Sequence, residues 1–128
     1  FLTERLFPDM FALTRQVQLA SDFAKGGAAR VAGVDVPSYA DTEASFDELD
    51  ARIRKTVSFI TSIPKEKFVG AEGRDITVPM RPEPRVFNAL TYLRHGALPN
   101  FFFHTTTTYD ILRHNGVELG KRDFLGVY

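Results

Sequence analysis

The chain has 128 residues, a length that predicts one domain, residues 1–128, with a core that needs no disulfide or structural metal. It has no cysteine, which excludes thiolate zinc sites and a cysteine nucleophile and fits a reducing, cytoplasmic location. Sixteen basic and sixteen acidic residues cancel, which argues against nucleic-acid binding, and no apolar run reaches the ~18–20 residues of a membrane span.

The first predicted helix begins near Pro8, because proline fits the first turn of a helix and Asp9 favours its positive end. Its apolar stripe extends to about residue 31 at helical spacing. The stripe consists of Met10, Leu13, Val17, Ala20, Ala24, Ala28 and Val31. Gln16 lies near the edge of this stripe and is closer to it in helical phase than Gln18.

A connector with Pro37 at its centre covers residues 33–40, and a second helix is predicted to start within residues 41–45. Ser45 and Glu48 have the spacing of a capping box. The predicted buried stripe of this helix contains Phe46, Leu49, Ile53, Val57 and Ile60. The opposite face is predicted to be solvated and contains Asp47, Asp50, Arg52, Arg54 and Lys55.

Residues 65–88 are rich in glycine and proline and contain alternating apolar residues, a pattern that favours a short β-hairpin or an extended loop. One or two helical turns are expected over residues 89–96. Pro99 is predicted to be the first residue of a final helix that runs to about Asn115, with Gly116 as its left-handed cap. The chain is therefore predicted to be all-α apart from one hairpin.

A single histidine of the final helix is predicted to face the interior. At 100° per residue, His104 shares a face with Phe101, Thr108, Ile111 and Leu112. Asn100 lies one turn earlier, at i and i+4, which is how a helix presents two ligands to a metal. The same pattern is also typical of a hydrogen-bonded core histidine and a capping asparagine. We expect burial to lower the pKa of His104.

Three consecutive phenylalanines, residues 101–103, point in three directions around the final helix. They therefore cannot all face one core. Phe102 and Phe103 are predicted to contact another helix or another chain, which makes them candidate interface residues.

These segments together resemble the DinB/YfiT-like superfamily of metalloenzymes. The resemblance is carried by LPNFFFH at residues 98–104, YDILRHNG at residues 109–116 and PDMFALTRQVQ at residues 8–18. It extends over nearly the whole chain, and it points to an uncharacterised branch of bacterial and fungal proteins. The resemblance implies a four-helix bundle, often dimeric, whose first helix precedes the residues of this chain.

Many members of that superfamily hold a divalent metal on three histidines, one from the second bundle helix and two from the last. The resemblance places those three positions at Gln16, or less favourably Gln18, at Asn100 and at His104. Two amides in place of two imidazoles weaken the binding of zinc or nickel. We therefore expect no cofactor and a degenerate site, a small polar pocket of His104, Asn100 and Gln16; the alternative is one divalent metal that uses His104.

The leading functional interpretation is a homodimeric DinB-like bundle of uncharacterised activity, with a small molecule as the candidate ligand. One alternative is a DinB-type transferase or hydrolase whose metal would recruit Asp9, Asp22 or His95 to His104. Another is a protein interaction module that uses Phe102 and Phe103. The sequence leaves open whether the protein is an enzyme.

Overall fold

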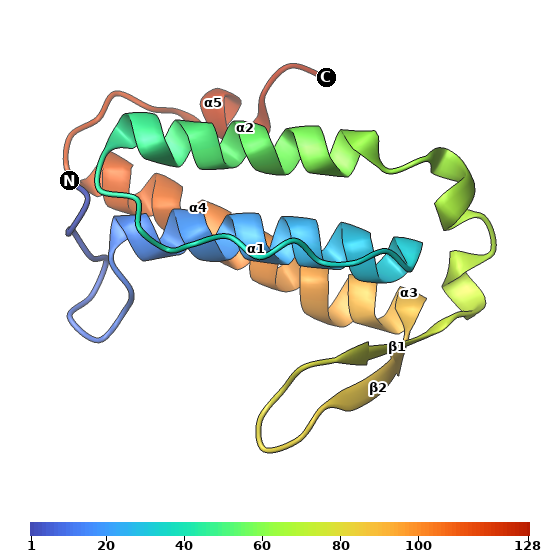
Figure 1. Ribbon diagram of the computed structural model, residues 1–128. Coiled ribbons are helices and arrows are strands. Elements are labelled where there is room, and N and C mark those ends of the chain that lie inside the picture. The colour runs from blue at the N-terminus through green and yellow to red at the C-terminus, as the bar shows by residue number, and fades with distance from the viewer.

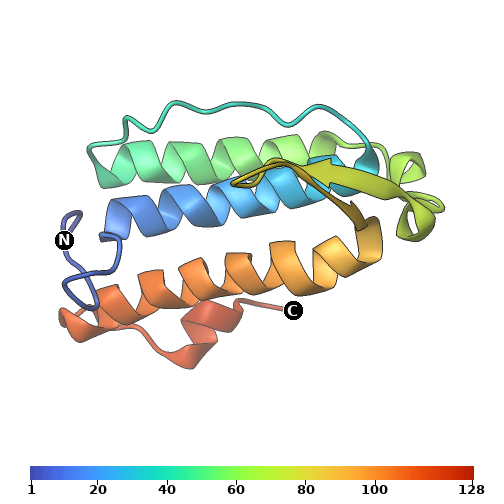
Figure 2. The same cartoon turned by 90° about the horizontal axis from the view of Figure 1, so that it is seen from below.

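The computed structural model describes residues 1–128 and contains three long helices, α1 Leu13–Ala32, α2 Phe46–Ser62 and α4 Leu98–His114. α1 lies between α2 and α4, and packs against both (Figures 1 and 2). The shorter elements are 3-10 turns Lys65–Phe68 and Ala71–Gly73, strands β1 Asp75–Val78 and β2 Arg85–Asn88, helix α3 Ala89–Tyr92, a π-helical turn Leu93–Ala97 and helix α5 Lys121–Leu125. The predicted all-α fold with one hairpin before the last helix is confirmed.

α1 and α2 run in the same direction, because the connector between them returns in an extended form along the helices (Figures 1 and 2). α4 runs antiparallel to both. The strands β1 and β2 form an antiparallel hairpin in which Ile76 pairs with Phe87. None of the helices combines the length and the apolar character of a membrane span.

The predicted start of the first helix at Pro8 is wrong, because α1 begins at Leu13. The preceding segment folds back over the first turn of α1. The amide of Leu13 donates to the carbonyl of Glu4, and the amide of Thr14 donates to the carbonyl of Leu2. Free N–H groups at a helix start need acceptors, and here the backbone of the N-terminal segment supplies them in place of a side-chain cap. The cap of α2 is confirmed, with the Oγ of Ser45 accepting from the amide of Glu48.

The predicted helix start at Pro99 is also corrected. α3, the π turn and α4 follow one another without a break, and Pro99 is the second residue of α4. In an α-helix a proline ring clashes with the carbonyl four residues earlier, here that of His95. The π turn immediately before α4 widens the helix at that point and accommodates the ring. Gly116 ends the helix with a φ of 90°, as predicted.

The apolar stripes of α1 and α2 line an open groove rather than a closed core. Ile53 and Val57, predicted as buried, are 44% and 55% exposed, and Phe46 is 50% exposed. The groove also takes in Val17, Ala20 and Ala24 of α1, Ile60 of α2 and Phe101 of α4. Helical phase therefore identified the apolar faces correctly, but the three long helices leave the space between them open on one side.

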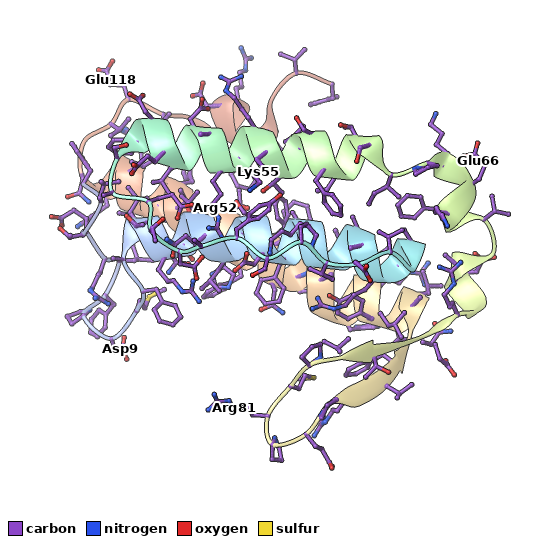
Figure 3. The ribbon with its side chains drawn as sticks, in the orientation of Figure 1. Asp9, Arg52, Lys55, Glu66, Arg81 and Glu118 are labelled. Atoms are coloured by element: carbon purple, nitrogen blue, oxygen red, sulfur yellow. The ribbon has the colours of Figure 1, made fainter.

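Arg52 was predicted to be solvated and is instead buried, with 2% of its side chain exposed (Figure 3). Its guanidinium contacts the carboxylates of Asp22 at 2.9 Å, Asp41 at 3.0 Å and Glu43 at 3.1 Å. The reason for the difference is the connector, which carries Asp41 and Glu43 across this face of α2. Arg52 therefore links the connector to α1, because Asp22 lies on α1.

Candidate functional site

His104 on α4 is buried against α1, and only 8% of it is exposed. Its Nδ1 lies 2.7 Å from the Oε1 of Gln16, which is 1% exposed. Positions 88 residues apart in the sequence are thus joined by a hydrogen bond in the interior. Two of the three residues predicted for a polar pocket are therefore in direct contact.

The hydrogen bonds of Gln16 determine where His104 carries its proton. The Nε2 of Gln16 donates to the carbonyl of Phe11 at 3.1 Å, so the Oε1 is the atom that faces the imidazole. An amide oxygen only accepts, and the Nδ1 of His104 must therefore be the protonated nitrogen. In the neutral ring the Nε2 of His104 then carries the lone pair.

Two aromatic rings enclose this histidine. The ring of Phe23 stacks on it at 5.6 Å between centroids, and the ring of Phe103 meets it edge-on at 5.2 Å. Burial disfavours the charged imidazolium, and the nearby cation of Arg15 adds to that effect, so the pKa of His104 is lowered. His104 is accordingly a neutral hydrogen-bonding group at physiological pH.

We expect the free energy of unfolding to decrease as the pH falls below about 6.5, the ordinary pKa of a histidine. In that range the unfolded chain takes up a proton at His104 while the folded chain, with its lowered pKa, does not. The decrease continues until the pH reaches the pKa of the folded state. Urea titrations between about pH 5 and pH 8 should give a flatter pH dependence for His104→Gln than for the wild type. Equal slopes would contradict this expectation.

Asn100 takes a different position from the other two predicted residues. Its Nδ2 donates to the carbonyl of Gly96 at 2.8 Å, and its side chain forms part of the wall of a separate cavity. Phe23 borders the same cavity and also stacks on His104. The structure therefore brings Gln16 and His104 together and places Asn100 in the wall of the cavity that Phe23 also borders.

The cavity has a volume of about 500 Å³ and lies between the hairpin, the π turn and α1. Its wall is formed mainly by apolar and aromatic side chains, among them Phe23, Met80, Phe87 and Tyr92. Thr91, His95 and Asn100 supply polar side chains to the same wall. Volumes of roughly 300–1,000 Å³ with a few convergent polar groups are usual for small-molecule sites.

Sequence reasoning did not assign His95 to this cavity, because the expected break at Pro99 separated its helical phase from that of His104. The continuous helix through the π turn places His95 and Asn100 on the same cavity wall. The spacing of apolar residues along the sequence does not reveal a π turn. The combination of Gly96 with Pro99 was the only local signal of an irregular turn at this point.

The donor set around His104 does not fit the metal that the resemblance implies. The Oε1 of Gln16 accepts a hydrogen bond from the Nδ1 of His104, on the opposite side of the ring from the lone pair on Nε2. It therefore cannot join that lone pair on one metal ion in this arrangement. Nowhere in the structure do three histidine, aspartate or glutamate side chains come together as a metal site.

The acidic residues considered as alternative ligands have other positions. Asp22 is paired with Lys25 at 2.8 Å and with Arg52 at 2.9 Å. Asp9 lies on the N-terminal loop outside the helices, and its side chain points away from them (Figure 3). The arrangement offers a hydrogen-bonded histidine and a mostly apolar cavity, and no carboxylate positioned for acid–base chemistry beside them.

The candidate interface residues lie on the outer face of α4. Phe102 is 51% exposed and Phe103 is 55% exposed. Together with Leu6, Met10 and Pro99 they line a shallow hollow between α4 and the N-terminal segment. Thr106, Thr107 and Asp110 complete the lining of this hollow. We call the hollow and the two rings together the α4 patch.

A model of a protein family, described as a domain of unknown function, DUF1993, matches residues 1–125. The chain belongs to this family. A solved structure of a DinB family member from Shewanella denitrificans is similar to the DUF1993 chain, with 38% sequence identity and a TM-score of 0.90. The match covers 99% of this chain and 72% of that one. No curated protein matches.

The comparisons confirm that the DUF1993 chain is a DinB-like protein of an uncharacterised family. The expected resemblance to the DinB superfamily, stated from residues 8–18 and 98–116, is thereby confirmed.

Proposed function

We propose that this DUF1993 protein is a DinB-like homodimer with a degenerate metal site, which binds a small molecule at a polar pocket beside His104 and does so without a metal. The observation that carries the proposal is the 2.7 Å hydrogen bond between Gln16 and His104. It occupies the amide oxygen that stands at the position of a metal ligand, and it fixes the orientation of the histidine ring, which burial keeps neutral.

Asn100 is the residue of the proposed pocket that a ligand in the cavity can contact. Its Oδ1 remains free because only its Nδ2 is used, in the hydrogen bond to Gly96. The cavity beside it is large enough for a small molecule, and Phe23 connects the cavity wall to His104 through ring stacking. A ligand in this cavity would contact Asn100 directly and would affect His104 through Phe23.

Metal analysis of the purified protein tests the proposal. We expect less than one tenth of an equivalent of zinc or nickel per chain, on the order of a contaminant, after purification in nickel-free buffer and incubation with zinc. The positive control is the double variant Gln16→His, Asn100→His, which restores three imidazoles. Its zinc affinity should rise at least about 100-fold, because even residues that only support a metal ligand contribute 10- to 100-fold. One tightly bound metal per wild-type chain, lost in His104→Ala, would contradict the proposal.

The second part of the proposal is a homodimer formed through the α4 patch. Two phenylalanines that are about half exposed lie beside a hollow of mixed apolar and polar residues, and water solvates such exposed rings poorly. In a two-fold dimer each copy offers the same surface, so Phe102 of each chain can occupy the hollow of its partner. A second copy of this chain therefore satisfies both features of the patch at once.

A further inference from the structure

We infer that the cavity between the hairpin and the π turn binds an uncharged, planar aromatic molecule that carries an N–H or O–H donor on one edge. The inference rests on the proposed function in one respect, since it names the ligand class of the pocket beside His104. It is independent of whether the chain binds a metal.

The shape of the cavity comes from three aromatic rings on three different elements. Phe23 belongs to α1, Phe87 to β2 and Tyr92 to α3, and all three border the same space. Phe87 and Tyr92 lie 6.5 Å apart between centroids, within the range of interacting aromatic pairs. Met80 on the hairpin closes one side with a flexible, polarisable side chain. A planar ring would gain stacking and edge contacts with these walls.

The charge of the cavity wall limits the ligand to uncharged molecules. None of its ten lining residues is an aspartate, glutamate, lysine or arginine. The guanidinium of Arg30 contacts one lining residue, donating to the hydroxyl of Tyr92 at 3.1 Å. An ionised ligand would lose its hydration on entry and find no opposite charge in the wall, which is costly.

Asn100 determines the polar edge of the ligand. Because its Nδ2 donates to Gly96, the orientation of the amide is fixed, and its Oδ1 is left as an acceptor. An acceptor in an apolar cavity selects a ligand with a donor and disfavours the same molecule without one. His95 lies on the same wall and can pair with a second polar atom.

The backbone explains why this site forms at this place in the fold. A π turn is rare and often marks a functional site, since its wide turn displaces side chains from the positions of a regular helix. Here the π turn contains His95 and Gly96, and Asn100 follows in α4, three residues after the turn ends. The hairpin supplies Val78, Met80 and Phe87 to the wall of the same cavity.

Indole is a suitable probe, because it is planar, uncharged and has one N–H donor. The protein contains no tryptophan, so indole fluorescence reports the probe alone. We expect saturable binding of indole, and NMR shifts at the amides of Thr91, Gly96 and Asn100. 1-Methylindole, which lacks the donor, should bind about fivefold more weakly, the effect of one neutral hydrogen bond.

Two variants locate the site. Asn100→Ala should abolish the preference for indole over 1-methylindole, and Met80→Ala should weaken both probes. Met10→Ala is the matched control, because Met10 is the other methionine of the chain and lies on the α4 patch. It should leave binding unchanged. Circular dichroism of each variant checks that the helices are intact.

The inference is overturned if indole does not bind saturably, if both probes bind equally, or if the NMR shifts fall in the groove around Val17 and Val57. The proposed function has a separate test. Tight zinc in the wild type together with indole binding would contradict the metal-free function and leave this inference standing. Absence of both zinc and indole binding would contradict this inference alone.

Discussion

Replacing Arg52 with methionine is expected to lower the free energy of unfolding by about 3 kcal/mol. The substitution keeps an unbranched apolar side chain in the space and removes the charge. The carboxylates of Asp22, Asp41 and Glu43 would then face one another without their common cation. The effect lies at the low end for a broken buried pair, because the side chains of Asp22 and Asp41 are 34% and 42% exposed.

Glu43 provides a second readout of the same variant. Burial raises the pKa of this carboxyl, but hydrogen bonds from Gln18 and Arg52, with the charge of Arg52, bring it below the ordinary value. We expect the pKa of Glu43 to increase in Arg52→Met, measured by NMR. Urea unfolding followed by circular dichroism gives the free energy.

Arg54→Met is the matched control for Arg52→Met. Arg54 is two residues away on the same helix and also pairs with an acid, Asp50 at 2.6 Å, but 78% of its side chain is exposed. Solvent screens such a pair, and its loss should leave the unfolding curve unchanged. Equal destabilisation by both variants would show that burial of Arg52 has no special importance.

Replacing Phe102 with serine is expected to dissociate the proposed dimer. An aromatic residue at the centre of an interface commonly contributes ~2 kcal/mol or more, so the dissociation constant should rise at least about 30-fold. Light scattering over a concentration series measures the molar mass. A dimer in the wild type and a monomer in Phe102→Ser at the same concentration is the expected result.

Phe46→Ser is the control for the α4 patch. Phe46 is 50% exposed, almost the same as Phe102 at 51%, but it lies on α2. If dimerisation depended only on the total exposed apolar surface, both variants would weaken the dimer. If the interface lies on α4, only Phe102→Ser weakens it. A monomeric wild type, or a dimer that persists in Phe102→Ser, would contradict the homodimer proposal.

The sequence predicted the elements of the fold because their signals are local. Ser45 with Glu48 identified the start of α2, and Gly116 identified the end of α4. The hairpin followed from its alternating residues between prolines. The helix starts at Pro8 and Pro99 were wrong for a common reason: proline permits a helix start but does not require one. Contacts from distant residues decided both cases, the carbonyls of Leu2 and Glu4 in one and the π turn in the other.

The candidate site was predicted in part from helical phase. Periodicity alone placed His104 on the inward face of α4, in agreement with its burial. The resemblance suggested Gln16 as its neighbour, and the two side chains are in contact. The role of these residues stays a prediction. The burial of Arg52 was not predictable from α2 itself, because the acids that pair with it come from the connector and from α1.

The π turn also lets the helical phase of α3 differ from that of α4, whereas a regular helix would keep the two phases the same. A π turn holds about one residue more than an α turn, so the residues before it are rotated by about 100° relative to a continuous α-helix. α4 packs on α1, whereas α3 packs mainly on the turn Ala71–Gly73 and on β2. Deleting one residue of this turn would therefore reshape the cavity side without moving His104 away from Gln16.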